Sequence, residues 1–457
     1  MGLRRSLRLR TLVATSAGLA LASSIYPAAV SAAEAAGGQL VWLAIAVAGL
    51  FCVMAASNFA ELSAMFPTAG GVQVYVRHAF GERLAVTVSL LYVVLAWAAG
   101  AAEAFVFASV LKVVTSIVPI PVISALPVEV WVILVISFFF FVNLRGIETA
   151  GRTQDFLTYG MFFLVLVLSA YGLVTAAAKG LILGGGGLAV GSGGPGPAPG
   201  GPAGFVQAVA YSIYLFIGFE WVTPLAEETT DIKVLPRAMP IAVGLLAVSY
   251  ALWTTAMVTW VPLSALSGSP TPHLLFAVAL AGPAGLLAVG AVSALATFTS
   301  FNAGMMGNSR LVYGMAREGV LPKALSRIHM TYFSPWAALT FMFAVQLVLA
   351  LLLSVTGAFA AAILMAAIIE CVIYCLVALV VMKLRKTRPE AERPYRAPGG
   401  LAAPLVTAVV FGLLAVAVIF PPSPVLVGPL FLLALGLAYL YARYAVPWIR
   451  ERSGRKT

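Results

Sequence analysis

The sequence has few charged residues. Only 9% of its 457 residues are charged, whereas a soluble globular protein has about 25%. The hydrophobic fraction is 62%, and apolar runs of about 20 residues recur along the whole length, as in membrane-spanning helices. Because a lipid core requires every backbone polar group to be paired within the protein, we predict an all-α membrane protein.

Histidine and cysteine are also rare, with three of each. We expect His78 and His329 in cytoplasmic loops and His273 in an outer loop, which excludes a histidine-rich site inside the membrane. None of the cysteines has metal-ligand spacing or the pattern of a secreted disulfide framework. Since a clustered nucleophile and base are missing as well, we predict no enzyme, no metal site and no cofactor.

The apolar runs predict twelve transmembrane helices. The spans are 11–33, 38–66, 84–116, 128–146, 153–177, 205–228, 238–262, 276–314, 334–356, 358–384, 401–421 and 425–448. The third and eighth are long, which indicates tilt or extension beyond the bilayer.

Basic residues are distributed asymmetrically about these spans. With a cytoplasmic N-terminus, only Lys112 and Lys179 of the 27 basic residues fall toward the outside. The positive-inside rule predicts this asymmetry, so we expect a multi-pass protein of the inner or plasma membrane with both termini cytoplasmic. The net charge of +11 then reflects topology and anionic lipid rather than nucleic acid. The N-terminal stretch also has the pattern of a secretory signal peptide, but the charge count argues against cleavage.

A stretch rich in glycine and proline divides the chain. Residues 178–204 read as a flexible extracellular loop between a first set of five spans in 1–177 and a second set in 205–384. Residues 385–457 hold spans 11 and 12 and a cytoplasmic tail. The sequence therefore suggests a layout of five plus five plus two.

Two spans contain residues that interrupt helices. Span 1 contains "TSAGLALASSIYP", and span 6 contains "LFIGFEW". Transporters built from inverted repeats bind substrate near the membrane midplane, where corresponding helices are broken. Glu220 follows Gly218 at the second of these points. An acid at the bilayer centre costs roughly 2.5–3.5 kcal/mol, so Glu220 is a functional candidate lining a cavity.

Three stretches carry a resemblance to a known family. "ELSAMFPTAGGVQVYVRHAFG", "GFEWVTPLAEETTDIKVLPRAMP" and "NSRLVYGMAREGVLP" resemble the end of span 2, span 6 with its loop, and the exit of span 8 in amino acid–polyamine–organocation transporters. The resemblance implies two inverted five-helix repeats of the LeuT type, with broken helices 1 and 6 around the substrate. It also implies secondary active transport by alternating access, and the absence of a P-loop pattern agrees.

The sequence departs from this family in two places. The Gly-Ser-Gly turn of helix 1 corresponds here to Ala22, Ser23 and Ser24, whose backbone N–H groups can still face a carboxylate. Some relatives carry a basic residue in helix 5 in place of a sodium ion, but the membrane part of span 5 has none here.

The candidate site residues follow from the breaks and the intramembrane acids. For substrate binding they are Ala22, Ser23, Ser24, Tyr214, Phe216, Gly218, Phe219 and Glu220. For proton coupling, or as amine ligands, they are Glu103, Glu220 and Glu370. Thr297, Thr299 and Ser300 form a possible cation site, with interhelical hydrogen bonds as the alternative. The loop acids Glu227 and Glu228 suggest a cytoplasmic gate with Arg77 or Arg310.

We therefore expect a secondary active transporter for an amino acid. Its partners are a small-molecule substrate, membrane lipid and a coupling proton. A proton is favoured over sodium because desolvation raises the pKa of a buried acid toward neutral pH. A polyamine or another organic amine is the alternative substrate. A channel is disfavoured because the spans lack a continuous polar pore.

Overall fold

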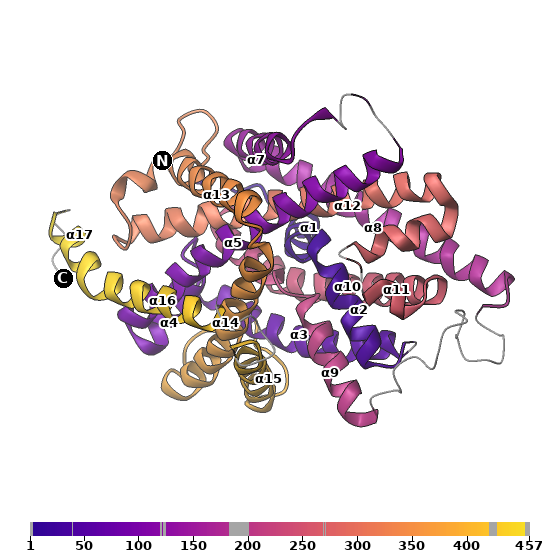
Figure 1. The fold of residues 1–457 in the computed structure, drawn as a ribbon. Helices are drawn as coiled ribbons and strands as arrows, with labels where there is room; N and C mark the ends of the chain where they lie inside the picture. The colour runs from indigo at the N-terminus through magenta and orange to yellow at the C-terminus, as the bar shows by residue number, and fades with distance from the viewer. Residues whose placement is uncertain are drawn as a thin grey trace.

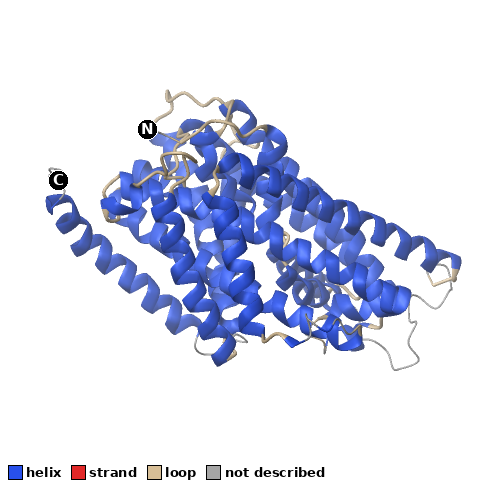
Figure 2. Cartoon of the chain, turned by 90° about the horizontal axis from the view of Figure 1, so that it is seen from above, coloured by secondary structure: helices blue, strands red, loops and turns tan. Residues whose placement is uncertain are grey.

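Nearly all of the described chain is helical. The protein is represented by a computed structural model that describes residues 3–38, 40–118, 121, 125–181, 201–267, 269, 271–419 and 427–452. Within this part of the chain there is no strand, and one isolated bridge joins Leu7 to Thr229. The helices form a single bundle, and the two chain ends lie toward the same side in both views (Figures 1 and 2).

The first half of the chain begins with a broken helix. Its elements are α1 (Leu9–Ala20), the 3-10 turn η1 (Ser23–Ile25), α2 (Tyr26–Ala35), α3 (Val41–Met65), α4 (Val72–Phe80), α5 (Glu82–Ile117), α7 (Val128–Leu144) and α8 (Ile147–Ala178). The predicted span 11–33 is thus two short helices with a turn between them. The segment after span 2, expected as a loop, contains the helix α4.

The second half of the chain is also built from helical elements. Its elements are α9 (Gly201–Tyr214), the 3-10 segment η2 (Phe219–Glu228), η3 (Ile232–Val234), α10 (Leu235–Trp260), α11 (Leu263–Ser267), α12 (Pro272–Arg317), η4 (Lys323–Ser326), α13 (Trp336–Thr356), α14 (Phe359–Thr387), α15 (Ala402–Ile419), α16 (Val427–Leu440), the π-helical η5 (Tyr441–Ala445) and α17 (Val446–Arg452). The sixth span, like the first, begins as a helix and is interrupted. Most of the loop 178–204 lies outside the described residues.

Ten helices of the described chain are long and apolar enough to cross a membrane. The predicted fourth span is the apolar helix Val128–Leu144, which has 17 residues. The predicted first span is divided between α1, with 12 residues, and α2, with 10. The all-helical membrane fold is confirmed, while the number twelve stays a prediction.

The eighth span is kinked. α12 has 46 residues, and inside it Ala281 and Gly282 leave the helical region, Gly282 with φ 57° and ψ −138°. Pro283 follows, and proline removes a backbone donor while its ring clashes with the preceding turn. The extra length of this span therefore includes a separate first segment, Pro272–Leu280, whereas the sequence indicated tilt or extension beyond the bilayer.

The two interrupted helices lie against each other inside the bundle. α1 packs against α8, α10, α12 and η2, and α2 packs against α9. Ala14 and Ala17 of α1 have no exposed surface, and such small residues let helices approach closely. This packing places both interruptions deep in the molecule.

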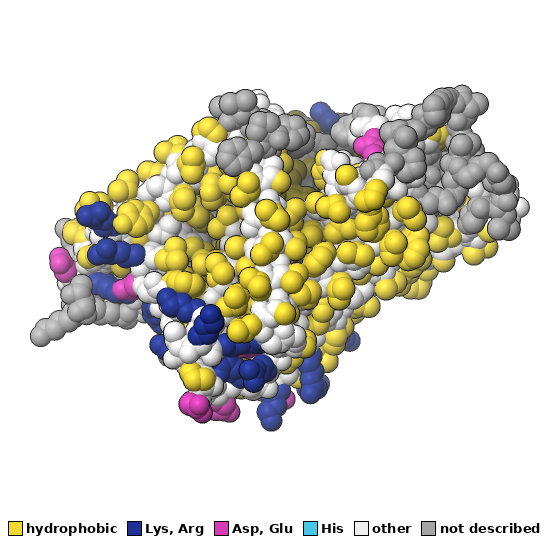
Figure 3. All heavy atoms as spheres, turned by 90° about the horizontal axis from the view of Figure 1, so that it is seen from below, with side chains coloured by type: hydrophobic (Ala, Val, Ile, Leu, Met, Phe, Trp, Pro, Cys, Tyr) yellow, Lys and Arg dark blue, Asp and Glu magenta, His cyan; other side chains and the backbone are white. Residues whose placement is uncertain are grey.

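Large apolar side chains cover much of the outer surface. Phe156 and Phe163 on α8 are 76% and 65% exposed, and Val355 on α13 is 83% exposed. Figure 3 shows a broad apolar surface with lysine and arginine side chains gathered toward one end. An apolar surface of this extent suits contact with lipid tails, and we refer to the end rich in lysine and arginine as the basic end.

Candidate functional site

The first interruption separates α1 from α2. Leu21 has ψ 66°, and Ala22 is extended with φ −104° and ψ 149°. Serine competes with helical backbone hydrogen bonding as a residue type, and Pro27 lies in the first turn of α2, where its missing N–H is not needed. The turn predicted from the sequence is therefore present at this position.

The interruption deprives carbonyl groups at the end of α1 of the N–H partners that a continuous helix would supply. Ala20 O accepts a hydrogen bond from Tyr250 Oη at 2.6 Å, and Leu19 O accepts one from Ser300 Oγ at 3.3 Å. Side chains from α10 and α12 thus satisfy groups that a continuous helix would have paired. The fold thus provides hydrogen-bond donors for the groups that the break exposes.

The second interruption separates α9 from η2. α9 ends at Tyr214, and Gly218 has φ 114° and ψ −5°, a left-handed conformation that favours glycine. A Cβ atom on Gly218 would lie 3.1 Å from Leu19 Cδ2. The N–H of Gly218 donates to Tyr374 Oη at 3.1 Å. The glycine thus provides both the turn and the close approach of the two broken helices.

Glu220 is fully buried beside this second break. Tyr92 Oη donates to Glu220 Oε1 at 2.5 Å, and Tyr374 Oη donates to Glu220 Oε2. The Tyr92 ring also stacks on Trp221, with 3.8 Å between the ring centroids. Both carboxylate oxygens are therefore bound by tyrosines of α5 and α14, a pair of ligands that the sequence analysis missed.

Glu103 is bound at the first break. The backbone N–H of Ser23 donates to Glu103 Oε1 at 2.8 Å, and Thr297 Oγ1 donates to the same oxygen at 2.7 Å. Ser23 Oγ donates to the carbonyl oxygen of Ser293 at 2.9 Å. One carboxylate thus joins α5, the second half of helix 1 and α12.

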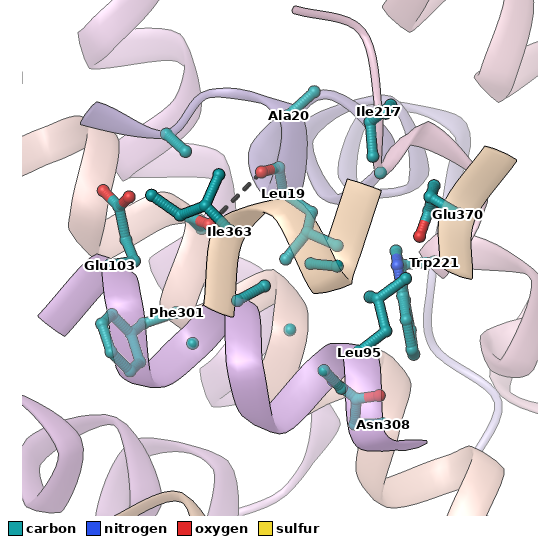
Figure 4. Close-up of a pocket in the computed structure, with 18 of the residues that line it drawn as sticks. Leu19, Ala20, Leu95, Glu103, Ile217, Trp221, Phe301, Asn308, Ile363 and Glu370 are labelled. Atoms are coloured by element: carbon teal, nitrogen blue, oxygen red, sulfur yellow. Dashed lines mark hydrogen bonds between the residues drawn. The ribbon is translucent and has the colours of Figure 1, made fainter. Parts of the chain in front are cut away.

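A cavity of about 100 Å³ lies between the two breaks. Glu103 and Glu370 lie on opposite sides of it, and Trp221 and Asn308 lie on the Glu370 side (Figure 4). Leu95 and other apolar side chains form much of the wall. The cavity therefore combines an apolar wall with acids at its two sides.

The structure places the predicted site residues in two groups. Six line the cavity: Ala22, Tyr214, Gly218, Ser300, Glu103 and Glu370. Six others are not part of the lining: Ser23, Phe216, Phe219, Glu220, Thr297 and Thr299. The side chain of Ser24 lies outside the described part. Glu220, expected to line the cavity, instead faces the two tyrosines, because they bind both of its oxygens.

One residue of the predicted cation site, Thr299, contacts the neutral amide of Gln154. Gln154 Nε2 lies 2.6 Å from Thr299 Oγ1, 2.9 Å from Thr158 Oγ1, and 3.2 Å from each of the carbonyl oxygens of Thr299 and Ala14. A Cβ atom on Gly18 would lie 2.0 Å from Gln154 Nε2. Four oxygens therefore surround one amide nitrogen between α1, α8 and α12.

A buried ion pair lies beyond the cavity, toward the basic end. Arg310 follows the cavity residue Asn308 on α12, and its Nε donates to Glu228 Oε2 at 2.7 Å. Arg310 has no exposed side-chain surface and Glu228 only 1%. This is one of the two gate pairs expected from the sequence, whereas Arg77 pairs with Glu318.

Other contacts join elements around this pair. Glu227 pairs with Arg317 and accepts from the N–H of Ala69 at 2.9 Å. The backbone N–H of Leu7 donates to Glu228 O at 3.0 Å. These paired charges and backbone hydrogen bonds form a layer that ties the start of the chain and the segment before α4 to η2 and α12.

Two histidines differ from their expected positions. His273, placed in an outer loop by the sequence, is the second residue of α12 and only 1% exposed. Its ring stacks on Tyr26, with 4.1 Å between centroids, because the segment Pro272–Leu280 folds back onto the bundle. His78 lies in α4 rather than in a loop. Among the described residues, no group of three or more His, Cys, Asp or Glu is placed to hold a metal ion.

Comparison with protein families gives one match along most of the chain. Residues 7–440 match the family described as amino acid permease. An uncharacterised transporter of Mycobacterium tuberculosis is 29% identical, over 78% of this chain and 76% of that protein. A branched-chain amino acid permease of Bacillus subtilis is 23% identical, over 87% of this chain and 84% of that protein.

A solved structure has the same fold. It is the crystal structure of a manganese transporter mutant from Eremococcus coleocola, with a TM-score of 0.60, 13% sequence identity and coverage of 98% of each chain. At this level of identity the likeness concerns the arrangement of the helices and not the ligand.

Proposed function

Because the chain belongs to the amino acid permease family, we propose that it is a secondary active transporter of an amino acid or a related organic amine. Transport proceeds by alternating access, without covalent chemistry. The cavity between two helix breaks is the observation that carries this proposal. In transporters of inverted-repeat architecture, substrate binds where such broken helices meet near the midplane.

The proposed drive is a proton gradient. Glu103, Glu220 and Glu370 are the candidate proton carriers, and each is at most 3% exposed. Acidic side chains inside membrane proteins form proton relays, and a buried carboxyl group can gain and lose a proton as its surroundings change. All three side chains lie near the breaks, where alternating access would change those surroundings.

Sodium is not expected to contribute. A sodium ion among Thr158, Thr299 and the carbonyl oxygen of Ala14 would occupy the position of Gln154 Nε2. The amide supplies N–H donors to these oxygens without a charge. Ser300 and Thr297 contact Leu19 and Glu103 instead, which favours the interhelical hydrogen bonds considered for these residues.

The proposed location is the inner or plasma membrane, with the basic end in the cytoplasm. The lysine and arginine residues gathered at one end support this orientation through the positive-inside rule. The layer formed by Glu228 and Arg310 then closes the cytoplasmic side of the cavity.

Uptake into proteoliposomes tests the proposal. We expect accumulation of a labelled amino acid or amine above its external concentration when the lumen is alkaline. Collapse of the gradient with a protonophore should abolish accumulation, and replacement of sodium by potassium should leave it within about twofold, a difference worth under about 0.5 kcal/mol. Equilibration without accumulation at any gradient contradicts secondary active transport.

A further inference from the structure

The carboxylate of Glu103 accepts a hydrogen bond from the backbone N–H of Ser23, the first residue of η1 after the break in helix 1. Both Ser23 N and Thr297 Oγ1 donate to Glu103 Oε1, at 2.8 and 2.7 Å. The start of a helix attracts an anion, because its first N–H groups lack partners and its dipole end is positive. Here the anion at the start of the helix is a side chain of the protein itself, Glu103.

The N–H group at the second break also has a partner within the protein, since Gly218 N donates to Tyr374 Oη. Among the described residues that line the cavity there is no lysine, arginine or histidine. A substrate carboxylate at the first break would have to displace Glu103 or lie beside it. Two carboxylates in a buried site repel each other, and an unpaired buried charge is costly.

The other side of the cavity contains polar atoms without partners. No side-chain hydrogen bond to either carboxyl oxygen of Glu370 is formed in the described part of the chain, although Glu370 lies beside Glu220 and Tyr374. Asn308 Oδ1 and Trp221 Nε1 also have no partner there. Glu370 and Trp221 have no exposed surface and Asn308 has 4%. Three of these four atoms are acceptors, so a group that satisfies them must supply several N–H donors.

An ammonium group has the required chemistry. It carries three N–H donors and a positive charge, and its charge offsets the cost of a buried carboxylate. Between Glu370 and Glu103 the cavity is lined by apolar side chains that include Leu95, Ile217 and Ile363. An alkyl chain attached to the ammonium group can pack along this wall.

We propose that Glu103 is a specificity-determining residue that takes the place of a substrate carboxylate, so that the cavity selects an organic amine without a carboxylate. The ammonium group binds at Glu370 and Asn308, and the apolar body points toward Glu103. This inference rests on the proposed transport function and assigns the substrate class of the same site.

Binding to the purified full-length protein tests the selectivity. Isothermal titration calorimetry would compare leucine with 3-methylbutylamine and ornithine with 1,4-diaminobutane, which are amino acids and their decarboxylated amines. We expect the wild type to bind at least one amine, and at least tenfold more tightly than its amino acid, about 1.4 kcal/mol. An amino acid that binds as tightly as its amine, or no binding of either amine, would overturn the inference.

Two substitutions of Glu103 distinguish the effect of its hydrogen bond with the N–H of Ser23 from the effect of its negative charge. Glu103→Ala frees the N–H of Ser23, so the amine-to-amino-acid affinity ratio should fall at least tenfold. Glu103→Gln removes the charge but keeps an acceptor, so the ratio should fall less. As a matched control, Glu370→Gln should weaken the amine about tenfold without strengthening the amino acid. An unchanged ratio in both Glu103 variants would contradict the inference. If neither variant folds, the wild-type ratio and Glu370→Gln decide.

Uptake of the same four compounds distinguishes the two proposals. Selective binding of amines with no accumulation of any compound contradicts the transport function but leaves the selectivity in place. Accumulation with a preference for the amino acids supports transport and overturns the role of Glu103.

Discussion

At the scale of single residues, Glu220 depends on two hydroxyl donors. Tyr92 and Tyr374 come from different helices and each donates to a different oxygen of the carboxylate. A carboxamide has one oxygen and one NH₂ group, so it can accept from only one of these hydroxyls as they are oriented. The carboxylate is therefore matched to its surroundings in both shape and hydrogen-bonding capacity.

Replacing Glu220 by glutamine tests its part in proton coupling. Glu220→Gln keeps the size of the side chain and removes its titration. We expect pH-gradient-driven uptake in proteoliposomes to fall at least tenfold, while exchange of labelled for unlabelled substrate without a gradient persists. Wild-type protein reconstituted at the same density is the control. Unimpaired gradient-driven uptake by this variant would remove Glu220 from the coupling mechanism.

The sequence identified Glu220 but not its partners. An acid after a glycine in an apolar span stands out because it is costly there. Tyr92 and Tyr374 are 128 and 154 residues from Glu220 along the chain, and a tyrosine in an apolar helix is ordinary. Gln154 is equally inconspicuous in the sequence, because a neutral amide in an apolar span carries no charge that would mark it. Such partners emerge only when distant helices are brought together.

At the scale of helices, the second break depends on one glycine. Gly218 combines φ 114° with contact to Leu19 of the other broken helix. An L-residue in the left-handed region costs about 1–2 kcal/mol, and its Cβ atom would press on Leu19. Both the left-handed turn and the close contact between the helices thus require glycine at this position.

Alanine at position 218 should therefore be destabilising. We expect Gly218→Ala to lower the midpoint of thermal unfolding in detergent by several degrees and to weaken substrate binding, because α9 and η2 are displaced. Gly244→Ala on α10 is the matched control, since a Cβ atom there has no neighbour within 4 Å. Equal midpoints for the two variants would show that the left-handed turn is dispensable.

Breaks are visible in a sequence to different degrees. The serines and Pro27 of helix 1, and Gly218 in helix 6, are local signals, and both interruptions were predicted from them. Gly282 and Pro283 carried an equally local signal for the kink in α12, but it was missed because the span was judged by its length. Hydropathy marks the extent of an apolar run and says little about bends within it.

At the scale of the whole molecule, the layer toward the basic end joins many parts of the chain. Glu228 and Arg310 are buried together, and breaking such a pair by removing one partner costs about 3–5 kcal/mol. The neighbouring pair of Glu227 and Arg317 is partly exposed, with side-chain exposures of 21% and 41%. Exposed pairs contribute about 0–1 kcal/mol, so removing one partner should matter more at the buried pair than at the partly exposed one.

Removing the buried charge should open the cavity toward the basic end. Met305 lines the cavity, so Met305→Cys in a background lacking the three native cysteines reports access to it. With Arg310→Gln added, we expect the cysteine to react at least fivefold faster with a thiol reagent applied from that side, because Glu228 loses its partner. Arg317→Gln is the control and should change the rate less than twofold. Equal rates in all three proteins would exclude the buried pair as a gate.

The overall layout was the most accessible level from the sequence. Apolar runs and positive charges identify a multi-pass helical protein because lipid imposes those constraints on every span. The pairing of Glu228 with Arg310 was anticipated, but the pairing of Arg77 with Glu318 was not, because opposite charges in neighbouring loops allow several combinations. Only the packing of the helices selects among them.

Three backbone hydrogen bonds between the start of the chain and the end of η2 with the residues after it provide a way to follow the proposed transport cycle. Ser6 N and Leu7 N donate to Glu228 O, and Thr230 N donates to Leu7 O. Under the proposed alternating access, these bonds separate when the molecule opens at this end, and each separation lets deuterium replace the amide hydrogen. We expect deuterium uptake at these amides, measured by mass spectrometry, to rise in Arg310→Gln. The rate of deuterium exchange at these three amides would then report how often this end opens, in a protein that carries no added label.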